Sequence, residues 1–170
     1  MKLTQLFPSA CAIAFTSALY IFVAQYFQVS AIWLPYISWA SYFLVGGKPS
    51  VLPKMIAGFT GGMLAGYVTI VAVSPVSGFV GSSFALPFVV FCLTLFILLL
   101  ELVKPIDMIP VYFFSYASFF AYFFGGFGGG DATPLSVLPL FWVLLMVGFG
   151  LGFLTAQLRK KILHMQGIQK

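Results

Sequence analysis

The sequence predicts an all-α integral membrane protein with six transmembrane helices, arranged as two inverted three-helix repeats. The first observation behind this prediction is composition: of the 170 residues, 62% are apolar and only 6% are charged, and the mean hydropathy is +1.11. A soluble domain could not cover such a chain with polar side chains. Because a spanning helix needs ~20 apolar residues, six spans fill the chain, and residues 1–170 are expected to form a single transmembrane domain.

The second observation is a duplicated set of motifs. Residues 38–43 read Ser-Trp-Ala-Ser-Tyr-Phe, and residues 115–120 read Ser-Tyr-Ala-Ser-Phe-Phe. Each stretch is followed by a pair of glycines and then by Ser-Val-Leu-Pro, at residues 50–53 and 136–139. Because each copy holds three spans, an odd number, the second copy should enter the membrane in the opposite orientation. Inverted repeats of this kind are typical of transporters and channels.

Each repeat should supply three spans, the first repeat over about 8–73 and the second over about 84–158. The expected spans are residues 8–27, 31–45, 53–73, 84–103, 108–124 and 138–158. The first resembles a signal peptide, but it is long and forms part of the repeat, so we expect it to remain as a span. Spans two and five are short, and Ser30 and Asp107 are their expected N-caps. The uncharged residues 74–83 are expected to form a linker.

The distribution of positive charge sets the expected orientation. With six spans, all eight Lys and Arg residues fall on one side of the membrane: Lys2, Lys48, Lys54, Lys104, Arg159, Lys160, Lys161 and Lys170. Cytoplasmic loops are enriched in Lys and Arg, so both termini should be cytoplasmic, in a bacterial inner membrane. The net charge of +5 is spread over four short segments, which does not indicate nucleic-acid binding.

Small polar side chains mark spans two and five as the candidate pathway through the membrane. Two serines three residues apart lie on one face of each span, and the pathway candidates are Ser38, Trp39, Ser41, Ser115, Tyr116 and Ser118. Short segments at matching positions of two inverted repeats point to a binding site near the midplane. Mid-span serines also commonly bond their own i−4 carbonyl or a neighbouring helix, which would make them structural.

Glycines line one face of spans three and six. Gly62 and Gly66 in span three and Gly148 and Gly152 in span six stand at matching distances from the repeated proline, and Gly58 extends the face of span three. A glycine face allows close helix packing, and the same backbone could instead line the pathway.

Glu101 is a candidate ionisable relay near the end of span four. The alternative interpretation is a structural ion pair with Lys104, three residues later.

The sequence predicts neither an enzyme nor a cofactor. Cys11 and Cys92 lie in separate apolar runs, and His164 has no second ligand at metal-binding spacing. The spans contain no Ser/His or paired-Asp arrangement that could carry catalysis. We therefore expect no catalytic, cofactor-binding or metal-binding residues.

Three stretches resemble the YcdZ-like family of small bacterial inner-membrane proteins: the Ser-Trp-Ala helix of span two with the glycine loop after it, the glycine face of span three, and Val137-Leu138-Pro139 with the glycines of span six. The resemblance covers most of the chain. A more remote likeness is to fusaric-acid-resistance-type and HPP-type membrane domains, which are associated with solute movement. The YcdZ-like family has no assigned activity, so the resemblance implies a membrane location and supplies no catalytic or ligand residues. The glycine loop 125–130 is longer than the resemblance leads us to expect.

The expected function is that of a channel or facilitator for a small neutral or weakly polar solute, with its site near the midplane between the two repeats. Spans two, three, five and six offer hydroxyls, glycines and aromatic rings there, without a buried charge. The alternative is a structural or accessory subunit that docks a partner through the glycine faces. The expected partners are the lipid bilayer, a small-molecule solute and further copies of the chain in a homo-oligomer, as a dimer or trimer.

Overall fold

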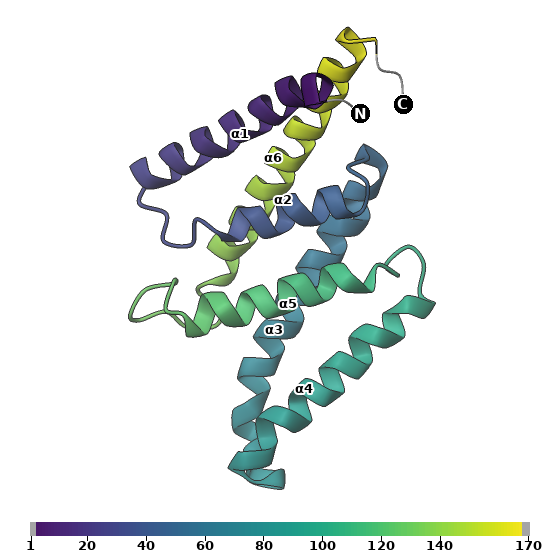
Figure 1. Ribbon diagram of the computed structural model, residues 1–170. Helices are drawn as coiled ribbons and strands as arrows, with labels where there is room; N and C mark the ends of the chain where they lie inside the picture. Colours follow the sequence, from purple (N-terminus) through teal and green to yellow (C-terminus); the bar gives the residue numbers. More distant parts are fainter. Residues whose placement is uncertain (1–2, 168–170) are drawn as a thin grey trace. The chain divides into compact units, whose positions relative to one another are not determined.

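The computed structural model describes residues 3–167, which form α-helices and two short 3-10 turns, with no strand in that range (Figure 1). The helices are grouped in two compact units. Unit 1 contains the residues up to Val51 and those from Met146 on, and unit 2 contains Leu52–Leu145. The last helix, α6 (Leu138–Met165), begins in unit 2 and continues in unit 1.

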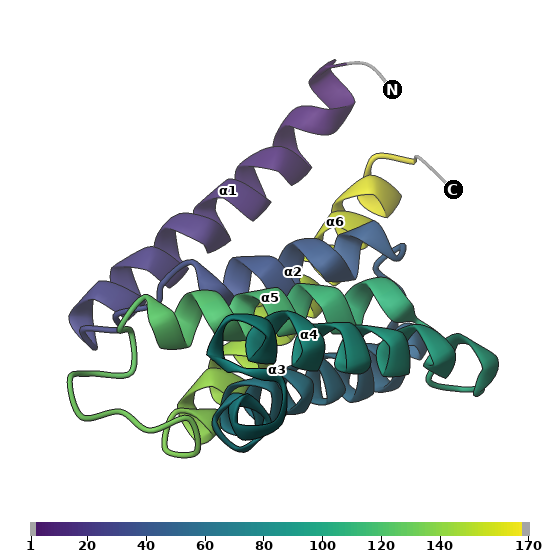
Figure 2. The ribbon, with the colours of Figure 1, turned by 90° about the horizontal axis from the view of Figure 1, so that it is seen from below.

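Unit 2 is built on a hairpin of two apolar helices, α3 (Leu52–Val80) and α4 (Ser82–Leu99), with α5 (Ile109–Phe124) packed along α3 (Figures 1 and 2). Only Gly81 separates α3 from α4, and its φ of +85° lies in a region that glycine adopts without strain. A 3-10 turn, η2 (Leu100–Leu102), follows α4. The hairpin brings the start of α3 and the end of α4 to the same end of the unit.

Unit 1 contains α1 (Leu3–Tyr26), α2 (Leu34–Leu44), the 3-10 turn η1 (Pro49–Val51) and the remainder of α6. The hydroxyl of Tyr20 in α1 donates to the carbonyl oxygen of Ile32, just before α2, at 2.8 Å. Figures 1 and 2 both show the start of α1, the end of α2 and the end of α6 directed toward the same end of this unit.

Within the described residues, four helices are long and apolar enough to cross a membrane: Leu3–Tyr26, Pro49–Val80, Ser82–Leu102 and Leu138–Met165. The other two are shorter, since α2 has 11 residues and α5 has 16. At ~1.5 Å per residue they extend about 16 Å and 24 Å, against a hydrocarbon core of about 30 Å. The six predicted spans are therefore found as four helices of spanning length and two shorter ones.

The predicted linker over residues 74–83 is wrong. Helix α3 continues through Pro75 to Val80 and stops only before Gly81. A proline removes one backbone hydrogen bond from a helix, but neighbouring helical turns and serine side chains satisfy backbone groups near it. The hydroxyl of Ser77, for example, donates to the carbonyl oxygen of Ser74 at 2.6 Å. Composition alone therefore predicted the end of the third helix too early in the sequence.

The two predicted N-caps are also wrong. Helix α2 begins after Trp33 without a side-chain cap hydrogen bond, because turns between α1 and α2 delay its start beyond Ser30. Helix α5 begins after Met108, again without a side-chain cap. The carboxylate of Asp107 accepts a hydrogen bond from Nζ of Lys54 at 3.4 Å instead.

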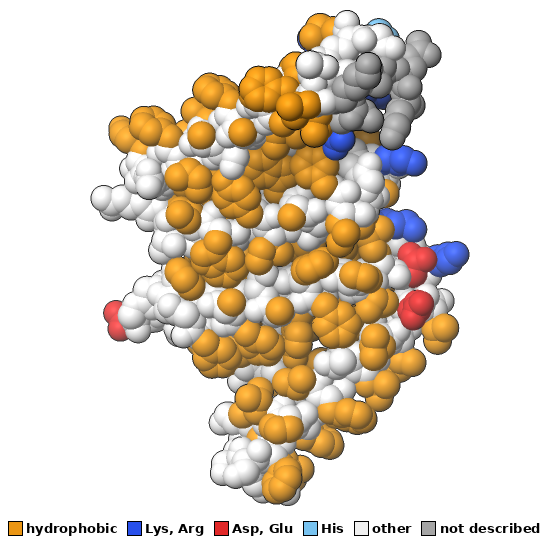
Figure 3. Space-filling model, in the orientation of Figure 1, with side chains coloured by type: hydrophobic (Ala, Val, Ile, Leu, Met, Phe, Trp, Pro, Cys, Tyr) orange, Lys and Arg blue, Asp and Glu red, His pale blue; other side chains and the backbone are white. Residues whose placement is uncertain are grey.

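Charged side chains lie at helix ends, whereas hydrophobic side chains cover the helix flanks (Figure 3). The Lys54–Asp107 pair joins the start of α3 to the turn before α5. Desolvation raises the pKa of the Asp107 carboxyl, but a hydrogen bond from its own backbone and the charges of Lys54 and Lys104 together lower it below its usual value. Within the described residues, Glu101 forms no ion pair with Lys104, because the chain is extended at Val103 and leaves the helical i, i+3 geometry.

Candidate functional site

In unit 2, the glycine face of α3 is covered by α5, and the glycines that face it are Gly58, Gly62 and Gly66. A methyl group added at Gly62 would overlap the carbonyl oxygen of Tyr112 and would lie 2.9 Å from Cβ of Ser115. A methyl group at Gly66 would lie 2.8 Å from the ring of Phe119. The two helices therefore approach so closely that a side chain larger than hydrogen has no room.

In unit 1, the glycine face of α6 is covered by α2 in the same way. A methyl group at Gly148 would overlap the carbonyl oxygen of Pro35 and the hydroxyl of Ser38. At Gly152, the nearest atom would be Cδ1 of Tyr42, at 3.0 Å. Helix α2 belongs to the first predicted repeat and α6 to the second, whereas α5 belongs to the second and α3 to the first. Each short helix therefore covers the glycine face of a helix from the other predicted repeat.

Each unit also contains a hydrogen bond between an aromatic side chain of the short helix and a threonine of the long helix. In unit 1, Nε1 of Trp39 donates to Oγ1 of Thr155 at 2.9 Å. In unit 2, the hydroxyls of Tyr116 and Thr69 lie 2.8 Å apart. Both threonine hydroxyls donate to the carbonyl four residues earlier in their own helix, so the aromatic group is the donor in each pair. All four side chains are buried.

The four predicted serines are buried, and their hydroxyls bond backbone carbonyls. Ser41 and Ser118 each donate to the carbonyl four residues earlier in their own helix, at 2.6 Å. Ser115 donates across the helix pair to the carbonyl of Phe59, also at 2.6 Å, and Ser38 donates three residues back at 3.2 Å. These hydrogen bonds agree with the structural alternative that the sequence left open.

Two buried hydroxyls on the short helices lack a hydrogen-bond partner in the described part of the chain. They belong to Tyr42 in α2 and Tyr122 in α5, and neither side chain is exposed. A buried polar group without a partner costs free energy and calls for an explanation such as a bound water or ligand. Both short helices thus carry a polar atom that is able to bond a small polar molecule.

An apolar groove of about 500 Å³ lies between α1 and α2. The rings of Tyr36 and Trp39 line it and stack with a centroid distance of 5.4 Å. Across from them, α1 contributes Ala14 and Ser17, and the Ser17 hydroxyl is hydrogen-bonded to that of Tyr36. The predicted residue Trp39 is thus placed between an open groove on one side and Thr155 on the other.

The sequence reasoning did not single out Thr69 or Thr155, although the signal was present. Residues 66–69 read Gly-Tyr-Val-Thr and residues 152–155 read Gly-Phe-Leu-Thr. Both threonines stand three positions after the last glycine of the face, so the sequence similarity between the two predicted repeats extends farther than the glycines alone indicated. Glu101, by contrast, is exposed in η2, which follows α4.

The chain matches the family described as "Protein of unknown function (DUF1097)" over residues 10–162. It belongs to that family. The match fits the prediction of a family without an assigned function, but it carries neither the YcdZ-like name nor the two remoter likenesses. No curated protein and no solved structure matched the chain.

Proposed function

We propose that the protein is a channel or facilitator for a small neutral or weakly polar solute, built as two inverted repeats. The observation that carries the proposal is the pair of short helices α2 and α5, which occupy matching positions in the two repeats and have 11 and 16 residues. In inverted-repeat transporters, short hydrophobic segments at corresponding positions form the substrate site at the repeat interface. Here each short helix meets the glycine face of the other repeat, so two such interfaces exist.

The chemistry of the short helices suits an uncharged solute. The groups available for a solute are the hydroxyls of Tyr42 and Tyr122, and the rings of Tyr36 and Trp39 in the α1–α2 groove. None of these groups carries a charge, and desolvating an ion would require compensating charges or several oriented dipoles. A small neutral molecule with one or two hydrogen-bonding groups would meet these requirements.

The alternative, an accessory subunit that docks a partner through its glycine faces, receives less support. The glycines at positions 58, 62, 66, 148 and 152 are already covered by helices of the same chain. A partner would therefore have to bind elsewhere. Exposed phenylalanine and leucine side chains along α1 and α4 offer apolar surface for lipid or for other copies of the chain. We keep a homo-oligomer, as a dimer or trimer, as part of the proposal, without enzymatic activity.

The proposed topology has six crossings, with both termini in the cytoplasm of a bacterial inner membrane. The described Lys and Arg residues lie at one end of each unit, as cytoplasmic enrichment in positive charge requires. A reporter inserted after Gly81 distinguishes the topologies. Six crossings place residue 81 outside, whereas it would be cytoplasmic if α2 did not cross. We also propose a relation to the YcdZ-like family and, more remotely, to fusaric-acid-resistance-type and HPP-type membrane domains. The two remoter groups are associated with solute movement.

Solute flux tests the function. Liposomes that contain the purified protein should swell in glycerol or urea faster than empty liposomes, and should exclude sucrose. Ala14→Leu places a larger side chain in the groove and should reduce the swelling rate. Ala18→Leu is the matched control, because Ala18 is an exposed alanine of α1 that does not line the groove. Swelling rates equal to those of empty liposomes for all three solutes would contradict the proposal.

A further inference from the structure

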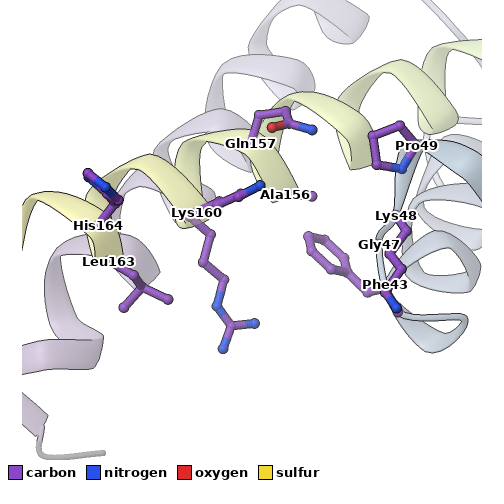
Figure 4. Close-up of a pocket in the computed structure, with 11 residues that line it drawn as sticks. Phe43, Gly47, Lys48, Pro49, Ala156, Gln157, Lys160, Leu163 and His164 are labelled. Atoms are coloured by element: carbon purple, nitrogen blue, oxygen red, sulfur yellow. The ribbon is translucent and has the colours of Figure 1, made fainter. Parts of the chain in front are cut away.

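A hollow of about 920 Å³ lies between the end of α2 and the last turns of α6, within unit 1 (Figure 4). One wall is the turn after α2, which contains Lys48. The other wall is α6, which contributes Arg159, Lys160 and His164. In Figure 4, side chains from both walls extend toward the space between them. Three Lys and Arg side chains thus line a single hollow, although Lys48 and the α6 residues are more than 100 residues apart in the sequence.

Unit 1 supplies no carboxylate side chain to balance these charges. The chain has three acidic residues, Glu101, Asp107 and Asp131, and all of them belong to unit 2. Asp107 is already paired with Lys54. Like charges gathered at one site repel one another and attract anions from their surroundings. The hollow therefore has the electrostatic character of an anion site.

We propose that this hollow binds a phosphate-bearing anion. Basic pockets beside membrane helices recognise phosphate headgroups, and the guanidinium of Arg159 can hold two phosphate oxygens at once. Phe43, Pro49 and Leu163 add an apolar part to the lining, which suits the glycerol and first methylene groups of a lipid. A soluble phosphate compound would use the cations alone. The inference is independent of the proposed solute flux.

The test measures anion binding to the full-length protein in a neutral detergent. Dissociation constants are determined by native mass spectrometry for dioctanoyl phosphatidylglycerol, dioctanoyl phosphatidylcholine and inorganic phosphate. The Arg159→Gln/Lys160→Gln variant should weaken phosphatidylglycerol binding about 25-fold, since each cation near a membrane surface contributes about fivefold. Lys161→Gln removes one positive charge from the next residue of α6, which does not line the hollow. This variant should weaken binding less than about twofold.

Each result bears on the proposal. Phosphatidylglycerol binding that millimolar inorganic phosphate does not displace identifies a lipid headgroup, whereas displacement identifies a soluble phosphate compound. The proposal is overturned if neither anion binds more tightly than phosphatidylcholine, or if Lys161→Gln weakens binding as much as the double variant. A charge-preserving variant, Arg159→Lys/Lys160→Arg, controls for folding. It should bind within about threefold of the unmodified chain, and loss of its binding at unchanged helicity would also overturn the proposal.

Discussion

Units 1 and 2 contain the same helix pairing but differ in what surrounds it. In both, a short helix lies on the glycine face of a long one, and an aromatic side chain bonds a threonine beyond the glycines. In unit 1, the short helix is bordered by a groove of about 500 Å³ and the cationic hollow of about 920 Å³. In unit 2, α4 packs against α3, and the Lys54–Asp107 pair occupies the charged end.

The comparison distinguishes helix contacts that both units share from surrounding features that differ between the units. At Gly62 and Gly148 the contacts shared by the two units leave no room for a side chain, because an added methyl group would overlap a backbone carbonyl oxygen. The groove and the cationic hollow described above both belong to unit 1. We therefore expect substitutions at the shared contacts to reduce the stability of both units, and substitutions in the groove or the hollow to act on unit 1 alone, through flux or binding.

The largest effect is expected at the glycine faces. Gly62→Leu in unit 2 and Gly148→Leu in unit 1 would each force two helices apart, because even a methyl group overlaps backbone atoms there. Both variants should fail to give folded protein, as measured by monodispersity in mild detergent. Gly78→Leu and Gly150→Leu are the matched controls on the same helices, because a methyl group meets nothing within 4 Å at either position. A well-folded Gly148→Leu protein would show that the α2–α6 pairing is not required.

Much of the helical architecture could be predicted from apolar runs. The predicted span 108–124 agrees with α5 at Ile109–Phe124 to within a residue. The predicted span 138–158 covers the apolar part of α6, and the helix itself continues to Met165 through basic residues that are good helix formers. Apolar content marks where a segment enters lipid, and it does not mark where a helix ends.

The pairing of the helices could not be predicted in the same way. The glycine faces indicated close packing, but which helix would cover each face depends on tertiary structure. The covering helices are α2 and α5, and the hydroxyls of their serines donate to backbone carbonyls. The cationic hollow was missed for a related reason. Lys48 and Arg159 are far apart in the sequence, and their charges indicated only membrane orientation until the fold brought them together.

A smaller effect is expected at the two threonines. Thr69→Val and Thr155→Val preserve the side-chain shape but leave the Tyr116 hydroxyl or the Trp39 indole N–H without its partner. Each variant should lose about 0.6–1.7 kcal/mol of stability, the average and the upper value for hydrogen bonds between membrane helices. Thermal unfolding in detergent measures the loss. Equal losses would support equivalent roles in the two units, whereas a loss in one unit alone would limit the equivalence to the glycines.

A still smaller effect on stability is expected at the serines that bond their own helix. Ser41→Ala and Ser118→Ala remove a hydroxyl whose bond to the i−4 carbonyl adds little to a helix. Stability should change by less than about 0.5 kcal/mol in either unit. If α2 and α5 form the pathway, the glycerol swelling rate of the double variant should nevertheless change. An unchanged rate and an unchanged unfolding temperature would together remove these two serines from the pathway.

The smallest effect, confined to unit 2, is expected at the ion pair. The pKa of Asp107 is lowered in the folded state, so the pair contributes stability that is fully present above the unfolded pKa of the carboxyl and is lost as the pH falls through its folded value. Asp107→Asn should therefore lower the unfolding temperature slightly at neutral pH, by less than either threonine variant, because Lys54 and Asp107 are both partly exposed. The difference between the variant and the unmodified chain should disappear in acid and diminish at high salt. Unit 1 has no Asp or Glu to respond in this way. A difference that persists at a pH well below the usual range of an aspartate would therefore assign the role of Asp107 to its backbone turn rather than to its charge.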